Sequence, residues 1–392
     1  MNLGIIAIGY NRRNSLERLL SSLNSCDYSG ASPLLIISVD KSDIIDVEEC
    51  AKVFQWKYGE KVVKTFPERQ GLYQHILKCG SYMEEYDLDA VAVFEDDIVP
   101  SVGFYQYMEQ AVEYYKDNDD IAGISLYSYR WNTIADRPFT PLDNGYDVYF
   151  SYFACSWGQI WLRKQWKAFT NWRVLEGVSG VENADIPQEI KGWTNSWLKY
   201  HIAYCTSQRK YFVYPYKSYA TCFSDQGEHT SGSSNRYQVP IVANSSVKYN
   251  FVEPTAGKVF YDAYFESISL AYRLDEQGFD TCIDFYGTKG NRKKQRYWLS
   301  LELKPYKIVK KYSLCMKPHE QNIFYNLGGN DIFLYDTTEK SSPKKETIEM
   351  ILNKFIYYFN GSIDKRIVLH YMKLGLCNRW QQCKNFINKI IK

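Results

Sequence analysis

The chain has 392 residues, of which 45% are hydrophobic and 17% aromatic, and its formal net charge at pH 7 is +2. This length is enough for two or three domains with a sizeable core, and the balanced charge gives no reason to expect a nucleic-acid partner. No apolar run approaches the ~20 residues that span a bilayer. No basic leader precedes the first apolar run, and the ten scattered cysteines are typical of reduced thiols, so a cytoplasmic protein is predicted.

The first 90 residues alternate between apolar runs and segments with helical spacing. Strands are predicted over 3–8, 34–40 and 62–64, and helices over 16–23, 46–57 and 70–84. This alternation is typical of a parallel sheet wrapped by helices. Neither the dinucleotide-binding glycine fingerprint nor the phosphate-binding glycine loop follows the first strand, which argues against a nicotinamide or flavin cofactor.

The next strand ends in three adjacent acids. Val91 to Phe94 is an apolar run of the kind that is buried on both faces of a sheet, and Glu95, Asp96 and Asp97 follow it directly. Three neighbouring carboxylates repel one another and are costly to desolvate, so a positive group is predicted beside them. The simplest candidate is a divalent metal, Mn²⁺ or Mg²⁺, because hard cations take oxygen ligands. The alternative is a solvated acidic turn.

The middle of the chain adds further elements and two polar loops. Helices are predicted over 104–116, 164–172 and 193–204, strands over 121–126 and 211–219, a mobile loop over 174–190, and a turn-rich loop over 224–232. After residue 240 the composition shifts to a helix over 262–276 and short strands over 281–286 and 332–335.

The last 50 residues are basic. From Lys344 on, Lys and Arg outnumber Asp and Glu by ten to three, and apolar residues recur at helical spacing. Such an amphipathic tail either docks on an anionic membrane surface or packs on its own domain. The predicted domains are therefore 1–240, 241–340 and 341–392.

Five short motifs occur in an order that is familiar from one enzyme family. They are Ile8–Arg12, Ser38–Asp40, Arg69–Tyr73, Phe94–Asp97 and Gly158–Trp161. Over residues 3 to 235 the chain resembles glycosyltransferases of the nucleotide-sugar-binding type A fold (GT-A), in particular the N-acetylglucosaminyltransferase I group and bacterial surface-polysaccharide glycosyltransferases. The resemblance implies an α/β, GT-A-like, mostly parallel sheet flanked by helices. An α+β extension and the basic amphipathic helical tail follow it.

The resemblance also implies roles for individual residues. The donor would be bound by Arg12, Asp40, Gln70, Glu95 and Asp96, the metal by Asp97 and His229, and the acceptor side of the cleft would be formed by Trp157 and Gly158. A metal at this point neutralises the diphosphate and so stabilises the leaving group. His229 could instead contact a phosphate oxygen, Asp40 could be a plain strand-end residue, and Trp157 could belong to the core.

The chain departs from the family at the catalytic base. An inverting transferase needs a carboxylate that takes the proton of the acceptor hydroxyl, but the stretch Trp193–Leu198, where relatives carry this acid, has none. The base would then be Asp185 or Glu189 from the preceding loop, with Asp185 preferred. The alternatives are Asp225 or Glu228 in the later loop, or a chain that has lost activity.

These observations favour an inverting, metal-dependent glycosyltransferase that moves a sugar, most simply from a UDP-linked donor, to a glycan. The acceptor would be a growing bacterial surface glycan of the capsule or O-antigen type, free or lipid-linked, and the enzyme would be peripheral on the inner face of the membrane. One alternative is a nucleotidylyltransferase, which would show a glycine-rich basic loop after the first strand. Another is a noncatalytic carbohydrate-binding protein, which would leave the three acids unexplained.

Overall fold

The protein consists of two compact units in the computed structural model, Met1–Ser300 and Leu301–Lys392. The division falls at residue 300, whereas the sequence analysis placed boundaries at 240 and 340. The structure describes residues 1–223, 225, 235–245, 248–290, 294–342, 345–359 and 373.

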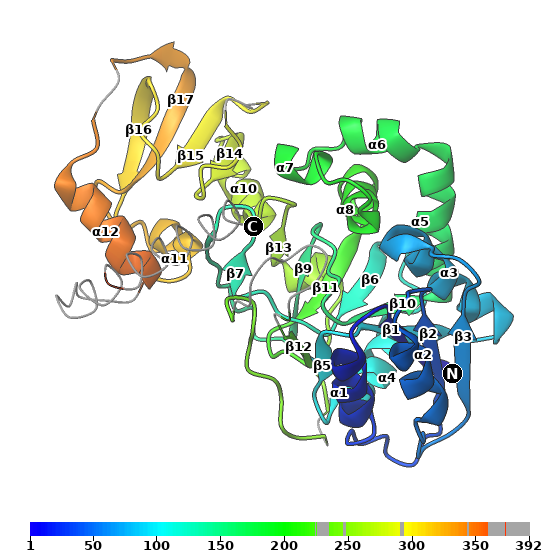
Figure 1. Ribbon diagram of the computed structural model, residues 1–392. Coiled ribbons are helices and arrows are strands. Elements are labelled where there is room, and N and C mark those ends of the chain that lie inside the picture. Colours follow the sequence, from blue (N-terminus) through cyan, green and yellow to red (C-terminus); the bar gives the residue numbers. More distant parts are fainter. Residues whose placement is uncertain are drawn as a thin grey trace. The chain divides into compact units, whose positions relative to one another are not determined.

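The first unit is built on a nine-stranded sheet with the order β13-β9-β11-β6-β10-β4-β1-β2-β3 (Figure 1). Within the described residues, five of its eight strand pairings are parallel, including all three that join β4, β1, β2 and β3. The predicted mixed α/β fold with a large, mostly parallel sheet is thus confirmed. Its strands are β1 (Leu3–Gly9), β2 (Leu34–Val39), β3 (Lys61–Thr65), β4 (Ala90–Glu95), β6 (Ile121–Ser125), β9 (Val148–Ser151), β10 (Gln159–Leu162), β11 (Tyr211–Pro215) and β13 (Phe260–Tyr261).

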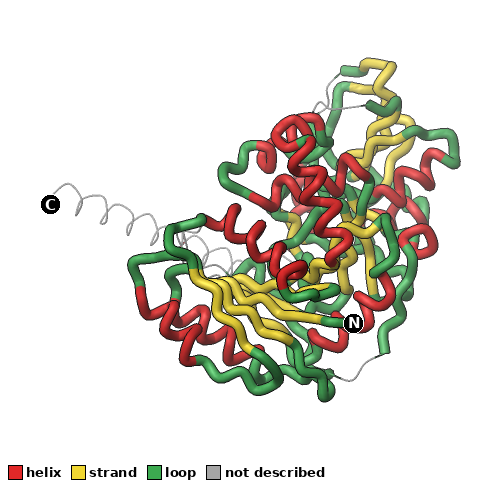
Figure 2. The backbone as a smooth tube through the Cα atoms, turned by 90° about the vertical axis from the view of Figure 1, so that its right-hand side faces the viewer, coloured by secondary structure: helices red, strands yellow, loops and turns green. Residues whose placement is uncertain are grey.

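Helices cover both faces of this sheet (Figure 2). Along β1, Ile5 and Ala7 pack in one core cluster and Ile6 and Ile8 in the other, as expected when side chains alternate along a strand. The first cluster contains apolar residues of α1, α2 and α4, and the second those of α3, α5 and α8. The helices of the unit are α1 (Arg13–Leu23), α2 (Ile45–Val53), α3 (Gly71–Glu85), α4 (Phe104–Tyr115), α5 (Arg163–Leu175), α6 (Gly177–Asn183), α7 (Gln188–Lys191), α8 (Trp197–Gln208), α9 (Pro254–Gly257) and α10 (Ile268–Asp275).

The prediction of a mobile loop over 174–190 is wrong, because that segment contains α6 and α7. Val181, Ile186 and Ile190 are buried in the second core cluster, and α6 contacts α8. The two helices are short and their apolar residues are irregularly spaced, so they are hard to recognise along the sequence. The burial of these residues is sufficient to stabilise the helices once α8 provides a surface to pack on.

Smaller strand pairs complete the fold. In the first unit, β5 (Ile98–Pro100) pairs antiparallel with β12 (Ala220–Cys222), β7 (Trp131–Asn132) with β8 (Arg137–Pro138), and β14 (Thr281–Asp284) runs parallel to β15 (Tyr297–Ser300). The second unit contains the antiparallel pair β16 (Tyr306–Tyr312) and β17 (Ile332–Lys340), and the helices α11 (His319–Phe324) and α12 (Ile348–Phe359).

His201 on α8 makes the fold sensitive to acid. Its side chain is fully buried and stacks on Phe169 with the ring centroids 4.2 Å apart, and burial lowers its pKa to about 3. Because the unfolded chain binds this proton more readily, stability falls as the pH drops below about 6.5, by about 1.4 kcal/mol for each pH unit.

His201→Phe keeps an aromatic ring and removes the titration. Urea unfolding of both proteins at pH 7.5 and 5.5 should therefore show a smaller loss of unfolding free energy in the variant. An equal loss in both proteins would contradict the assignment of this acid sensitivity to His201.

Candidate functional site

The carboxyl ends of β1, β2 and β4 meet at one edge of the sheet. Ile8 is in register with Glu95, and Gly9 with Val39, so the loop after β1, Asp40 and the three acids come together there. Ligands of open α/β sheets bind at this edge. A pocket of about 170 Å³, called here the strand-end pocket, lies at this point. It is lined by Ile8, Gly9, Tyr10, Asn11, Arg12, Asp40, Arg69, Gly71, Leu72, His75, Glu95, Asp96 and Asp97.

Arg12 provides the positive charge that the three acids require. Its Nε donates to Asp96 Oδ2 at 3.3 Å, its Nη2 donates to Asp96 Oδ1, and Nη2 lies 3.3 Å from Asp97 Oδ2. One guanidinium thus pairs with two carboxylates. From the sequence, a positive group was predicted here, but it was expected to be a metal, and Arg12 was expected to bind the donor.

The pairing leaves the acids incompletely neutralised. Burial, followed by the charges of Asp97 and Asp96, raises the pKa of Glu95 to about 8. Burial also raises the pKa of Asp96 to about 6 and that of Asp97 above its ordinary value, although Arg12 opposes both shifts. An additional cation would therefore be stabilised at this place.

Asp40 holds the start of α3. Its Oδ1 accepts from the backbone N–H groups of Lys41 and Gln70, and its Oδ2 from that of Gly71, all at 2.8 Å. A carboxylate at a helix N-terminus satisfies free N–H groups and interacts favourably with the helix dipole. This contact fixes the Gln70–Gly71 backbone against the strand-end pocket, and a role of Asp40 or Gln70 in donor binding stays a prediction.

Tyr10, Arg69 and His75 are among the pocket residues that were not singled out from the sequence. The Arg69 guanidinium lies 4.9 Å from the centroid of the Tyr10 ring. His75 is buried, its Nε2 is 2.7 Å from Ser38 Oγ, and burial lowers its pKa to about 4, so the ring is neutral near pH 7. Tyr10 and Arg69 are inside motifs that carry the family resemblance, which was the available signal. His75 follows Gly71 by one helical turn and so points to the same side of α3.

The residues present fit a metal that is held mainly by the substrate. Among the described residues, no three His, Cys, Asp or Glu side chains form a group able to hold an ion. Mg²⁺-like ions bound with substrate phosphates need only one or two carboxylates, however. Asp97, whose side chain is 28% exposed, offers such a ligand, and Glu95 lines the same pocket. His229 lies outside the described residues.

The segment after β12 contacts the chain at the three acids. The backbone N–H of Phe223 donates to the carbonyl oxygen of Asp97 at 2.6 Å. Asp225 accepts from Ser15 Oγ at 2.8 Å and from Arg18, which anchors this segment to α1. Although burial opposes the shift, these two bonds hold the pKa of Asp225 below its ordinary value. Asp225 thus lies near the strand-end pocket, and Glu228 is outside the part of the chain that is described.

The two preferred candidates for the base lie elsewhere. Asp185 lines a second pocket, and its Oδ1 accepts from the Tyr264 hydroxyl at 3.4 Å. Glu189 is exposed in the first turn of α7. Neither belongs to the lining of the strand-end pocket, so within the described chain the structure does not bring them together with the three acids there.

Trp157 packs against both core clusters, and Gly158 lies beside the first. The Trp157 ring is partly buried, with its centroid 4.9 Å from those of Tyr127 and Tyr237. Gly158 has φ +83°, and a Cβ there would lie 2.7 Å from Ala220 Cβ. Both positions are explained by packing, and a contact with the acceptor stays a prediction.

Gly158→Ala should lower the free energy of unfolding by about 2–4 kcal/mol, because it adds the strain of positive φ to the overpacking against Ala220. Gly145→Ala is the matched control, since Gly145 has φ +79° and nothing within 4 Å of its Cβ position. Denaturant unfolding should show a loss of only about 1–2 kcal/mol in the control. Equal losses would mean that the close approach to Ala220 has no energetic weight.

Comparison with known proteins identifies no family. No family model and no curated protein sequence matches the chain. Solved structures with partial similarity include S. aureus TarS 1-349 in complex with UDP-GlcNAc, at 14% identity over 60% of this chain and 62% of that chain with a TM-score of 0.37. Another is the mannosyltransferase PcManGT from Pyrobaculum calidifontis in complex with GDP-Man and Mn²⁺, at 11% identity over 47% and 52% with a TM-score of 0.32.

A cytidylyltransferase from Leptospira borgpetersenii also shows similarity, at 14% identity over 44% of this chain and 64% of that chain with a TM-score of 0.26. The chain spans about three fifths of the length of S. aureus TarS 1-349. The neighbours thus include both sugar transferases and a nucleotidyl transferase, and similarity at this level does not distinguish between them.

Proposed function

We propose that the protein is an inverting, metal-dependent glycosyltransferase that transfers a sugar from a UDP-linked donor to a bacterial surface glycan. The observation that carries the proposal is the strand-end pocket. It combines acids, two arginines and an aromatic ring at the carboxyl ends of three parallel strands.

The pocket residues suit the parts of a nucleotide sugar. The Tyr10 ring and the Arg69 guanidinium offer flat faces, and stacking of a base on such a face contributes about 1–3 kcal/mol. The partly exposed carboxylate of Asp97 would hold the metal, which would neutralise the diphosphate and so stabilise the departing UDP. Glu95 and Asp96 would accept hydrogen bonds from hydroxyl groups of the ribose and donor sugar.

The pocket also bears on the nucleotidylyltransferase alternative. Such an enzyme must hold a nucleoside triphosphate, whose added negative charge needs several basic groups. Two arginines are the basic side chains that line this pocket in the described chain, and Arg12 pairs with Asp96 and Asp97. Product analysis separates the two reactions, since a transferase releases UDP from UDP-sugars whereas a nucleotidylyltransferase releases pyrophosphate from UTP and a sugar phosphate. Release of pyrophosphate would overturn the proposal.

For the catalytic base, Asp225 and Asp185 stand as the two candidates. Asp225 is favoured by the Phe223–Asp97 contact, which brings its segment to the strand-end pocket. Asp225→Asn should then lower kcat by about 10²–10⁴ and leave UDP binding unchanged, while Asp185→Asn should not. The reverse pattern in a turnover assay would assign the base to Asp185. Wild-type activity of both variants would exclude both residues.

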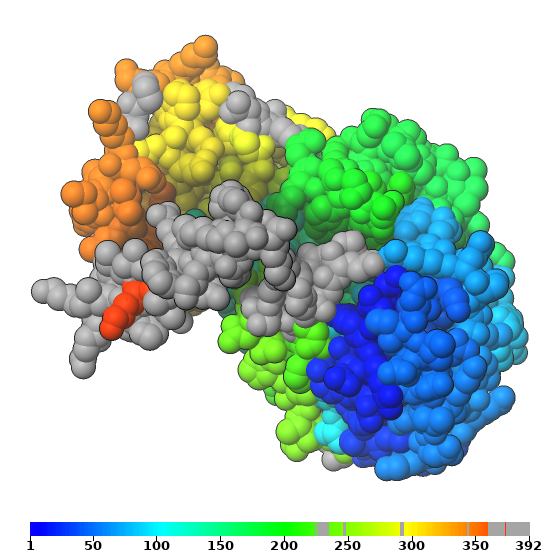
Figure 3. All heavy atoms as spheres, in the orientation of Figure 1, coloured from blue at the N-terminus to red at the C-terminus, as the bar shows by residue number. Residues whose placement is uncertain are grey.

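We also propose that the C-terminal region binds an anionic membrane surface. In the described part of the chain, no helix has the length and hydropathy needed to cross a membrane. On α12, however, apolar side chains lie at the surface of the second unit (orange in Figure 3). These are Ile348, Ile351, Leu352, Phe355, Ile356 and Phe359.

Cosedimentation with vesicles of anionic phospholipid tests the membrane proposal. The full chain should bind these vesicles, and Ile351→Asp should weaken binding because a charge on the apolar face opposes insertion. Failure of the full chain to bind anionic vesicles would overturn the proposal.

A further inference from the structure

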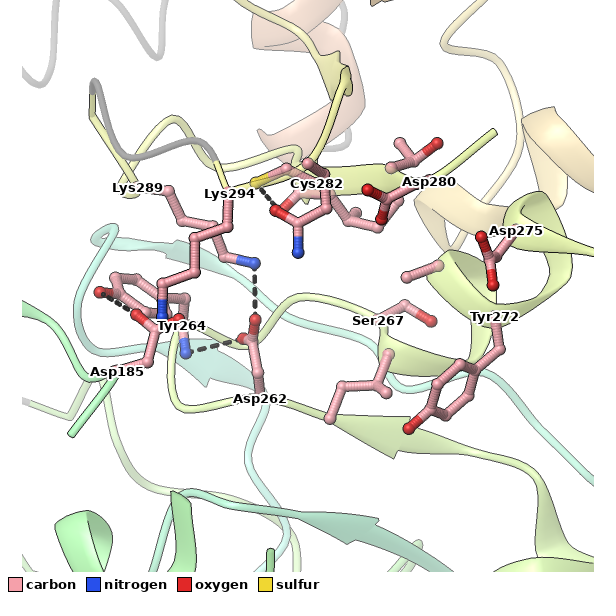
Figure 4. A pocket seen from close by; sticks show the side chains of 15 residues that line it. Asp185, Asp262, Tyr264, Ser267, Tyr272, Asp275, Asp280, Cys282, Lys289 and Lys294 are labelled. Carbon is pink, nitrogen blue, oxygen red and sulfur yellow. Dashed lines mark hydrogen bonds and ion pairs between the residues drawn. The ribbon is translucent and has the colours of Figure 1, made fainter. Parts of the chain in front are cut away.

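A second pocket, of about 300 Å³, lies within the first unit (Figure 4). Its lining comes from α10, from the start of β14, from the chain on either side of these elements, and from Asp185. This pocket, called here the α10 pocket, is larger than the strand-end pocket. Of the residues discussed above for the transfer reaction, only Asp185, the less favoured candidate for the base, lines it.

One wall of the α10 pocket is a linked set of polar groups. Lys289 Nζ lies 2.6 Å from Asp262 Oδ2 and 5.4 Å from the centroid of the Tyr264 ring, and the Tyr264 hydroxyl donates to Asp185. In Figure 4 these groups lie on one side of the open space, and Tyr272, Asp275 and Asp280 lie on the other. Donors and acceptors therefore face one another across the pocket.

The polar wall is held in place from behind. The Lys289 side chain is only 15% exposed; burial lowers its pKa, but Asp262 and other neighbouring groups raise it by more, so the ammonium group stays charged. Glu266 is buried, and its backbone N–H donates to Asp262 Oδ1 at 2.9 Å. Its Oε1 accepts from the backbone N–H of Tyr286 at 2.8 Å. The wall is thus preorganised for binding rather than free to move with solvent.

The charges of the lining restrict the ligand. The lining carries four aspartates and two lysines, so a phosphate or another anion would be repelled. In the part of the chain that is described, no three of the acids converge as metal ligands, which argues against a metal ion held by these side chains alone. A neutral molecule with many hydroxyl groups satisfies both conditions. Carboxylates accept from hydroxyls, the ammonium group donates to them, and the half-exposed ring of Tyr272 can pack against C–H groups.

We propose that the α10 pocket binds a neutral sugar residue. Its identity as part of the acceptor glycan rests on the proposed function, whereas the sugar site itself does not. The volume is in the range of small-molecule sites, and the mixture of an aromatic face with charged acceptors and a donor suits a polyhydroxylated ligand better than an apolar one.

Saturation-transfer NMR on the full chain tests the proposal, with glucose, galactose, mannose, N-acetylglucosamine and N-acetylgalactosamine as probes. At least one sugar should bind, and Tyr272→Ala should weaken its binding about tenfold through loss of the aromatic face. Asp275→Asn should weaken it as well. The matched controls are Tyr325→Ala, which removes another exposed tyrosine, and Glu276→Gln, which changes the next acid along the chain; neither lines the pocket.

Two results would overturn the sugar site. One is that none of the five sugars binds, and the other is that Tyr272→Ala and Asp275→Asn bind as the controls do. UDP titration in the presence of Mn²⁺ on the same proteins separates this outcome from failure of the proposed function. Sugar binding that depends on Tyr272, without any binding of UDP, would support the sugar site in the α10 pocket and refute the transferase. UDP binding without any sugar binding would support the transferase and refute the sugar site.

Discussion

Asp97→Asn should reduce metal-dependent binding of UDP by at least about 100-fold, because loss of a group that only supports a metal ligand already costs 10–100-fold. The amide keeps the shape of the carboxylate and removes its charge. Since burial raises the pKa of Asp97 and so disfavours its charged form, the free energy of unfolding should change little. Calorimetric titration of UDP in the presence of Mn²⁺ measures the first effect, and urea unfolding measures the second.

The matched control for this variant is Asp117→Asn, which makes the same change at an exposed position outside both pockets. Its UDP binding should equal that of the wild type. Retention of metal-dependent binding by Asp97→Asn would show that Asp97 is not a metal ligand.

Arg12→Gln should lower the free energy of unfolding by about 2–3 kcal/mol, because it leaves Asp96 and Asp97 without their counterion. The Asp96 side chain is only 7% exposed, so water cannot replace the guanidinium fully. Asp96→Asn in the same chain should restore much of the loss, since it removes the uncompensated charge. Urea unfolding of the two single variants and the double variant forms a double-mutant cycle.

The cycle has a clear contrary result. If the effects of the two substitutions are additive, the contact between Arg12 and Asp96 does not stabilise the fold.

The effect of a metal on the melting temperature gives a second test. Mn²⁺ should raise the melting temperature of Arg12→Gln more than that of the wild type, because the cation then replaces the missing charge. An equal rise in both proteins would argue against metal binding beside these acids.

The first hundred residues could be predicted well from the sequence. Apolar runs that end in Gly9, Asp40 and Glu95 identify β1, β2 and β4, and the rule for parallel sheets places their ends together. The edge of the sheet that carries the strand-end pocket followed directly from this pattern.

The pairings inside the site could not be predicted. The Arg12–Asp96 pair joins residues 84 positions apart, and nothing in either local pattern indicates that the guanidinium would turn to the acids. For the same reason the sequence could not show that Asp185 faces Tyr264 across 79 positions in another pocket. Local periodicity determines which residues form strands and helices, whereas the partners of charged side chains depend on how those elements pack.

The α6–α7 segment shows the same limit for secondary structure. Gly177, Gly180 and Pro187 are signals of a loop, and packing against α8 overrides them. The sequence shows the three apolar residues that are buried in this segment, but it does not show the surface on which they pack.

The measurement that tests the central proposal most directly is a calorimetric titration of UDP into the purified full chain, with and without Mn²⁺. The proposed transferase predicts binding that appears only with the metal and that is lost in Asp97→Asn. If UDP, GDP and CMP all fail to bind in the presence of Mn²⁺, the three acids do not bind a nucleotide, and the glycosyltransferase proposal is wrong.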